Sequence, residues 1–152
     1  MRIIEITNPT EKSAVARTIL EALTDWFGVE ASREAYIRGA AEQPCFAAFE
    51  GDQPLGFLCL KPTGDATVEL AVMGVRCDHH REGIGRRLFK AAKEFARSQG
   101  YQFMQVKTVK MGVYEDYDRT NRFYISLGFK EFECIPELWD AANPCQIYIM
   151  AL

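Results

Sequence analysis

Two glycines one residue apart, Gly83 and Gly85, stand where an apolar run gives way to a strongly helical pattern. Glycine lets the backbone approach a bound group closely, and a helix beginning there would present unpaired N–H groups and the positive end of its dipole. Such a junction suits an oxyanion such as a pyrophosphate, although a plain tight turn would also explain it. Neither nucleotide motif fits, because the dinucleotide fingerprint needs glycine at Leu88 and a P-loop needs Lys then Ser or Thr at Arg86 and Arg87.

The stretch His80–Leu88 resembles the first signature of the GNAT superfamily of acyl-CoA-dependent N-acetyltransferases, Gln/Arg-x-x-Gly-x-Gly/Ala. Gly83 and Gly85 occupy its two small positions. The first position of the signature is histidine here, and neighbouring Arg81 could supply the charge that a Gln or Arg side chain would otherwise bring to a phosphate.

Forty residues after Gly83, the stretch Phe123–Phe129 is similar to the second GNAT signature, Phe-Tyr-x-x-x-Gly-Phe. The fuller family pattern has Asn and Ala before that Phe, and this chain has Tyr117 and Thr120 there. The resemblance is good from Val68 to Phe132 and weak over the first sixty residues, where the identity of the acceptor would be encoded.

Composition predicts one domain over residues 1–152, and the resemblance implies that it is a single GNAT-like acetyltransferase domain. The chain has 152 residues, of which 48% are hydrophobic and ten are Phe, enough for a core of its own. A net charge of −3 argues against nucleic acid as a partner. Basic residues nevertheless line one predicted helix: Arg81, Arg86, Arg87, Lys90, Lys93 and Arg97. Those at its N-terminus suit the phosphates of a coenzyme, whereas Lys93 and Arg97 farther down fit a solvated face better.

The five cysteines are odd in number, far apart in sequence and without a C-x-x-C pair, which favours reduced thiols and no metal. No apolar targeting segment follows the N-terminus and no run of eighteen apolar residues occurs. We therefore expect a cytoplasmic protein with no membrane partner. Whether the chain forms a homodimer stays open.

Periodicity predicts alternating strands and helices, with Ser32 and Asp118 capping the second and last helices. This pattern alone indicates α/β or α+β with a mixed sheet. The resemblance implies the GNAT architecture, a mainly antiparallel central sheet splayed in the middle and flanked by helices, with acyl-CoA in the splay. The predicted strands are 2–6, 45–50, 55–61, 67–75, 103–109, 130–135 and 146–150, and the first two helices are 9–26 and 32–41.

Acetyl transfer to an amine requires a base, and Glu69 is the only ionisable side chain between Asp65 and Arg76. The resemblance makes it the leading general base, because several GNAT enzymes carry a Glu at this register that removes the amine proton, often through water. Burial in such a strand would raise the pKa of a carboxyl group toward a useful value. A Glu on a solvated strand face would fit the alternation equally well.

The reaction also needs donors for a developing oxyanion and help for the departing thiolate. The resemblance assigns the first task to backbone N–H groups of Met73, Gly74 and Val75, although Gly74 also fits a β-bulge. It assigns the second to the phenol of Tyr124. A core tyrosine on an amphipathic helix is the structural alternative.

The resemblance thus implies an N-acetyltransferase that moves the acetyl group of acetyl-CoA to a primary amine by direct transfer in a ternary complex. A catalytically silent acyl-CoA-binding or regulatory module is the alternative, and the acceptor amine is unidentified. Trp26, Phe27 and Tyr117 could contact that acceptor, although large aromatics are more often core. The residues expected to bind the coenzyme are Met73, Gly74, Val75, Arg81, Glu82, Gly83, Ile84, Gly85, Arg86 and Thr120.

Overall fold

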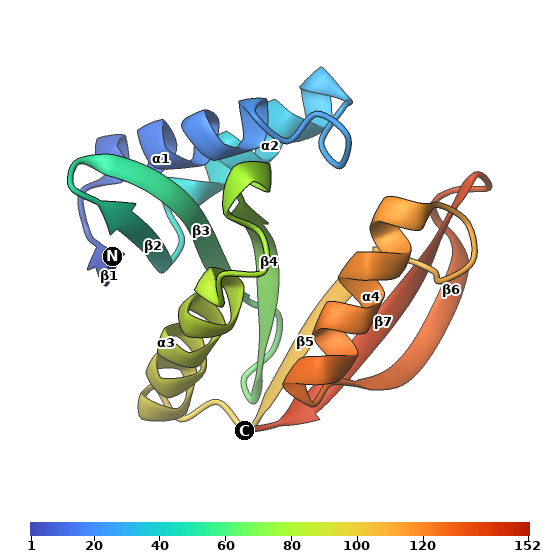
Figure 1. The fold of residues 1–152 in the computed structure, drawn as a ribbon. Helices are drawn as coiled ribbons and strands as arrows, with labels where there is room; N and C mark the ends of the chain where they lie inside the picture. The colour runs from blue at the N-terminus through green and yellow to red at the C-terminus, as the bar shows by residue number, and fades with distance from the viewer.

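The computed structural model describes residues 1–152 as a seven-stranded sheet with helices on both faces (Figure 1). The strands are β1 (Arg2–Ile6), β2 (Cys45–Glu50), β3 (Gln53–Pro62), β4 (Thr67–Val75), β5 (Phe103–Val109), β6 (Lys130–Asp140) and β7 (Asn143–Ala151). The helices are α1 (Pro9–Glu21), α2 (Glu30–Ala40), α3 (Ile84–Ser98) and α4 (Glu115–Leu127), with a short 3₁₀ turn at Cys77–His79.

The sheet order is β1-β2-β3-β4-β5-β7-β6, and every neighbouring pair is antiparallel except β4 with β5. The parallel pairing is short, from Thr67 opposite Phe103 to Leu70 opposite Val106. Beyond these residues the two strands diverge (Figure 1). The predicted fold class, a mainly antiparallel sheet splayed in the middle, is therefore confirmed.

A β-bulge lies where β4 leaves β5. The register of β4 with β3 shifts between the pairs Cys59–Val72 and Leu60–Leu70, so Ala71 has no partner across the ladder. Residues two apart share one face of a regular strand, yet Leu70 packs with α3 and Val72 packs with α1. The extra residue therefore exchanges the faces of the side chains that follow it, and it bends the strand.

The prediction of a bulge at Gly74 is wrong, because that residue keeps a regular partner in Phe57. Its small size has another cause. A Cβ atom at Gly74 would lie 2.8 Å from Leu23 Cδ1 and 3.0 Å from Ile19 Cγ2, so glycine is what lets α1 and the turn after it pack directly on β4.

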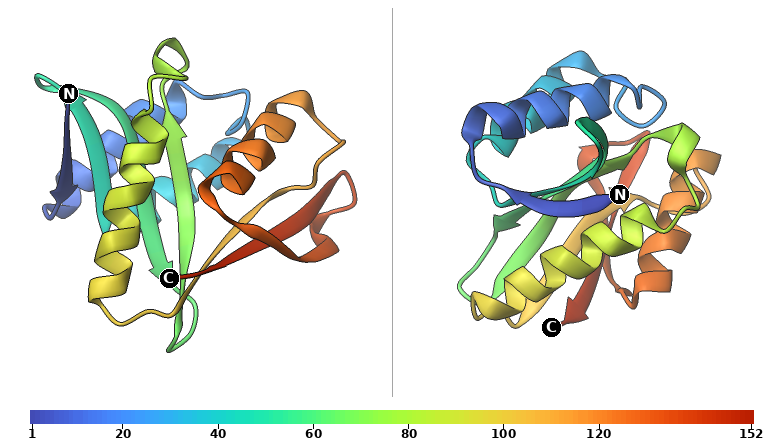
Figure 2. Two further views of the ribbon diagram at one scale, coloured as in Figure 1. Left: turned by 60° about the horizontal axis from the view of Figure 1, so that its bottom comes forward. Right: turned by 60° about the vertical axis from the view of Figure 1, so that its left-hand side comes forward.

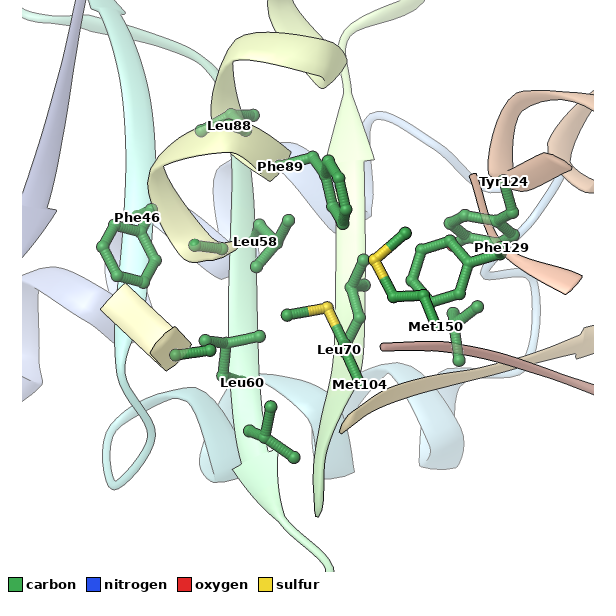
Figure 3. Close-up of a cluster of buried hydrophobic side chains, with 14 of the residues drawn as sticks. Phe46, Leu58, Leu60, Leu70, Leu88, Phe89, Met104, Tyr124, Phe129 and Met150 are labelled. Atoms are coloured by element: carbon green, nitrogen blue, oxygen red, sulfur yellow. The ribbon is translucent and has the colours of Figure 1, made fainter. Parts of the chain in front are cut away.

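Two hydrophobic clusters hold the helices on the sheet. α1 and α2 pack on one face of strands β1 to β4, and α3 packs on the other (Figure 2). The α3 cluster also joins the two halves of the splayed sheet, because α4 lies over β5 and β7 on the same side (Figure 3). Side chains from both halves meet there, among them Leu88, Phe89, Met104, Tyr124, Phe129 and Met150.

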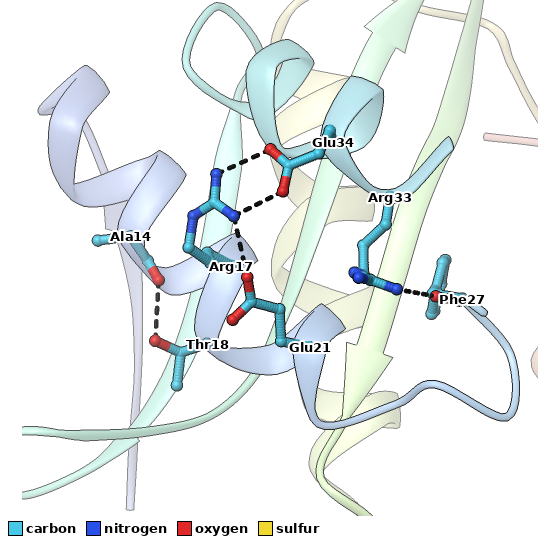
Figure 4. A network of polar contacts seen from close by, with 7 residues as sticks. All are labelled: Ala14, Arg17, Thr18, Glu21, Phe27, Arg33 and Glu34. Atoms are coloured by element: carbon cyan, nitrogen blue, oxygen red, sulfur yellow. Dashed lines mark hydrogen bonds and ion pairs between the residues drawn. The ribbon is translucent and has the colours of Figure 1, made fainter. Parts of the chain in front are cut away.

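Charged groups fix α2 against α1 (Figure 4). The Arg17 guanidinium donates to both carboxylate oxygens of Glu34, at 2.6 and 2.9 Å, and to Glu21 at 2.9 Å. Arg33 donates to the carbonyl of Phe27 at 2.9 Å and so holds the connection between the helices. These contacts set the position of the face of α2 that carries Tyr36.

Three predicted helix boundaries are wrong. α1 ends at Glu21 rather than Trp26, because the N–H groups of Ala22 and Leu23 turn to carbonyls three residues back, those of Ile19 and Leu20. α2 begins at Glu30, before the expected cap at Ser32. Asp118 lies inside α4, where its carboxylate accepts from the N–H of Gly112 at 2.7 Å rather than capping the helix.

Strands β4 and β5 have the predicted bounds, and the last two strands are longer than predicted because they form one hairpin. All five cysteines are free thiols, although Cys45 and Cys59 lie opposite each other on β2 and β3. None of the helices combines the length and apolar character needed to cross a membrane.

Candidate active site

The loop before α3 is shaped to hold an anion with its backbone. Arg81 and Gly83 have positive φ angles of 65° and 78°, and Gly83 is the N-cap of α3 without offering a side chain. The N–H groups of residues 81–86 form no hydrogen bond within the protein. By contrast, α1 is capped by the side chain of Asn8, which accepts from the N–H of Glu11. A left-handed residue among unpaired amides at a helix N-terminus fits an anionic group such as a phosphate.

The two histidines beside this loop are bound to the protein itself. His80 donates from Nε2 to the carbonyl of Val75 at 2.7 Å, and its ring lies edge-on to Trp26. His79 Nδ1 lies 2.9 Å from Glu82 Oε2, and this hydrogen bond raises the pKa of His79. The Glu82 side chain is thereby engaged with His79. The backbone N–H of Glu82, which has no partner in the protein, is the group that it can offer to an anion.

The second glycine of the pair has a packing role. A Cβ atom at Gly85 would lie 3.0 Å from Phe123 Cζ and 3.1 Å from Met73 Cε. Its absence lets the start of α3 contact α4, and Arg86 reinforces that contact by donating to the Ser126 hydroxyl at 3.1 Å. Ile84 between them is buried, which anchors the start of α3 in the core.

The end of β4 offers backbone groups toward the diverging strand. Arg76 donates its N–H to the Leu55 carbonyl on β3 at 2.9 Å. Because backbone groups of successive strand residues point to opposite sides, those of Val75 and Met73 point away from β3, toward β5. The pairing of β5 with β4 has already ended at Val106, so no strand accepts the N–H groups of these two residues.

Tyr124 approaches the same region from α4. Its side chain is 8% exposed and its ring packs against Phe129 and Tyr148. Its hydroxyl forms no hydrogen bond with the protein, whereas the neighbouring Tyr148 hydroxyl donates to Asn121 Oδ1 at 2.6 Å. Burial raises the pKa of Tyr124 well above its usual value, so the phenol stays protonated at neutral pH.

Glu69 lies on the opposite face of the sheet. Its neighbours Val68 and Leu70 pack in the α3 cluster, so the Glu69 side chain points toward α1 and α2. Its side chain is 14% exposed, and Oε1 accepts from Lys107 Nζ at 3.0 Å, while Oε2 accepts nothing from the protein. The solvated-face alternative is therefore wrong for this residue.

Tyr36 and Cys145 lie near this ion pair. Burial, with a smaller contribution from the Glu69 charge, raises the pKa of Tyr36. Burial likewise raises the pKa of the Cys145 thiol to about 11, against a lowering influence from Lys107. Both groups are thus neutral at physiological pH. The phenols of Tyr36 and Tyr117 make smaller contributions to the raised pKa of Tyr124.

The expected acceptor residues lie where three segments meet. The Tyr117 hydroxyl donates to the Trp26 carbonyl at 2.8 Å, and Phe27 packs edge-on to Tyr36 with ring centroids 5.8 Å apart. Thr120 donates to the carbonyl of Asp116 within α4. The aromatic residues thus connect the chain after α1 with α2 and with α4.

The sequence did not point to Lys107, Tyr36 or Asn121. Lys107 alternates with apolar residues in β5, and that pattern alone could have placed it on the same face as Glu69. Nothing local distinguishes Tyr36. Asn121 is fully buried, and its amide donates to Val109 and Tyr117 while accepting from Tyr148, so it anchors α4 to β5 and β7.

Solved structures share this fold over nearly the whole chain. An acetyltransferase assigned to the GNAT family from Desulfovibrio desulfuricans is 19% identical over 99% of this chain and 98% of that chain, with a TM-score of 0.86. An aminoglycoside 6'-N-acetyltransferase in complex with coenzyme A is 19% identical over 99% and 97%, with a TM-score of 0.76. The IAA acetyltransferase from Bacillus cereus is 19% identical over 99% and 99%, with a TM-score of 0.77.

No curated protein matches the sequence. The model of the acetyltransferase (GNAT) family, however, matches residues 9–129, which include both glycine signatures and the diverging strands. The chain therefore belongs to the GNAT family of acetyltransferases.

Proposed function

We propose that this protein transfers the acetyl group of acetyl-CoA to a primary amine, directly and within a ternary complex. The observation that carries the proposal is the run of unpaired N–H groups at residues 81–86, which opens α3 beside the divergence of β4 and β5. The coenzyme A bound to the similar aminoglycoside acetyltransferase supports the choice of cosubstrate.

In this proposal different residues bind different parts of the cosubstrate. The amides of Arg81 to Arg86 hold the pyrophosphate, and Thr120 adds a hydroxyl from α4. The N–H groups of Met73 and Val75 lie along the thioester arm, with Gly74 between them facing α1 instead. Acetyl-CoA supplies an activated acyl group, and these donors orient it and stabilise negative charge on its carbonyl oxygen.

Glu69 and Tyr124 then act from opposite faces of the sheet. The free Oε2 of Glu69 takes the proton of the acceptor amine, directly or through a water molecule. Tyr124 donates a hydrogen bond to the departing sulfur. Complete proton transfer from this phenol to a thiolate would be uphill, because the pKa of the phenol is raised and a thiol has a pKa of about 8.5.

Acetyl-CoA is expected to stabilise the folded protein. At 100 times its dissociation constant it should add about 2.7 kcal/mol to the free energy of unfolding, because it binds the native state alone. Thermal unfolding with and without acetyl-CoA, together with calorimetry, measures this. The absence of both a shift and binding heat would overturn the coenzyme assignment. A catalytically silent module would bind equally well, so release of free coenzyme A thiol with a broad amine panel separates the two.

Glu69→Gln is expected to lower turnover chiefly at low pH, where few acceptor amines are already neutral and a base is needed most. At high pH the rates of variant and wild type should approach each other. A pH profile of kcat/KM with one good acceptor tests this. Glu5→Gln is the matched control, because Glu5 is an exposed residue on the far edge strand β1. Equal rates for Glu69→Gln and wild type across the profile would remove Glu69 from the mechanism.

A further inference from the structure

The ion pair of Glu69 with Lys107 sits at the vertex of the splayed sheet. Leu70 and Val106 are the last paired residues of β4 and β5, so Glu69 precedes the divergence and Lys107 is the first β5 residue beyond it. Both side chains point to the face covered by α1 and α2, since their neighbours Leu70 and Val106 pack in the α3 cluster. The proposed base therefore has the side chain of a lysine as its hydrogen-bond partner.

Two titratable side chains, Tyr36 and Cys145, are close enough to this pair for its charges to affect their pKa values. The Glu69 charge contributes to the raised pKa of Tyr36, and Lys107 opposes the rise in the pKa of Cys145. The phenol and the thiol are both neutral at physiological pH, because burial raises the pKa of each. The ion pair, in which the Glu69 side chain is 14% and the Lys107 side chain 28% exposed, therefore lies beside two neutral groups.

A site of this kind discriminates among amines by their charge. An amine that carries only positive charge can pair with Glu69, but it then lies beside the Lys107 ammonium and leaves that cation without its partner. An amine with a neighbouring carboxylate avoids this. Its ammonium pairs with Glu69 and its carboxylate with Lys107, so every charge keeps a counter-charge.

We propose that the acceptor is an amino acid or a similar zwitterion, whose carboxylate is bound by Lys107 while its amine is presented to Glu69. This inference rests on the proposed acetyl transfer and names the substrate class for it. It also argues against a polyamine or an aminoglycoside as the acceptor, because a lysine beside the base would repel a substrate that carries only positive charge. A lysine that only joined the two strands would stabilise the fold without affecting the choice of acceptor.

The test compares matched acceptors in the intact protein. Each pair is an amino acid and the amine that lacks only its carboxylate, such as phenylalanine with phenethylamine and leucine with isoamylamine, and release of free coenzyme A thiol gives kcat/KM. We expect the amino acid of an accepted pair to be preferred by about 10- to 100-fold, the scale of one charged hydrogen-bonded contact. Lys107→Met should bring this ratio close to one, mainly through KM.

Two further variants separate binding from strand joining. Lys107→Arg keeps the charge and should keep the preference, even if Lys107→Met folds poorly. Lys130→Met removes an exposed lysine of the edge strand β6, which does not contact Glu69, and should leave the ratio as in wild type. Thiol release from the carboxylate-free amines alone, or a ratio unaffected by Lys107→Met, would overturn this inference while the acetyltransferase assignment stands. Release with neither class would overturn the proposed function and this inference together.

Discussion

Tyr124→Phe is expected to slow the chemical step by about 10²- to 10³-fold, the usual cost of removing one hydrogen-bond donor from a developing anion. The structure separates this effect from any effect on stability. The Tyr124 hydroxyl forms no hydrogen bond with the protein, so its removal leaves no buried partner unsatisfied, and the ring contacts with Phe129 and Tyr148 remain. Folding and acetyl-CoA affinity should change little.

Single-turnover measurement with a good acceptor is the appropriate assay, because slow product release could hide the loss in kcat. Tyr148→Phe is the matched control. It removes the neighbouring hydroxyl that donates to Asn121 and leaves a buried acceptor unpaired, so it should cost about 1–3 kcal/mol of stability with little change in the chemical step. An unchanged chemical step in Tyr124→Phe would leave Tyr124 as a core residue.

Gly83→Val is expected to weaken acetyl-CoA binding by at least about 100-fold, equivalent to the loss of two charged hydrogen bonds of about 1.5 kcal/mol each. The φ angle of 78° is unfavourable for a β-branched residue, so the loop should leave the conformation that aligns the amides of residues 81–86. Arg81→Ala removes one exposed charge and should cost about fivefold at most. Calorimetry with coenzyme A measures both.

Gly51→Val controls for strain alone. Gly51 has a similar φ angle of 59°, and like Gly83 it has open space around its Cβ position, but it lies in the turn between β2 and β3. Both variants should lose about 1–2 kcal/mol of stability, and only Gly83→Val should lose coenzyme affinity. Equal coenzyme binding by Gly83→Val and wild type would place the phosphate elsewhere.

The two predicted catalytic groups approach the divergence of β4 and β5 from opposite faces of the sheet. Glu69 points toward α1 and α2, while Tyr124 belongs to the cluster under α3. The bulge at Ala71 follows Glu69 on β4 and turns the side chains of Met73 and Val75 toward the α3 side, where Tyr124 packs. A route through the splayed sheet would thus place an acyl group between base and hydrogen-bond donor, as direct transfer requires.

Local sequence signals were sufficient for the parts of this protein that local chemistry decides. The glycine pair at Gly83 and Gly85 marked the start of α3, because a positive φ angle and an uncapped helix leave a direct imprint on residue choice. The apolar residues of β4 and β5 predicted the correct strand bounds, because burial of a strand also determines which residue types it carries. The family resemblance of the two signatures was likewise confirmed.

Contacts between distant segments decided the rest. α1 ends before Trp26, whose carbonyl accepts a hydrogen bond from Tyr117, 91 residues away, and no local propensity encodes that contact. The bulge at Ala71 depends on the register with β3, and the partner of Glu69 depends on which strand lies beside β4. Sequence alone therefore predicted an anion-binding loop and a candidate base, whereas only the tertiary structure placed a lysine beside that base, because pairing across a sheet is set by register and not by residue type.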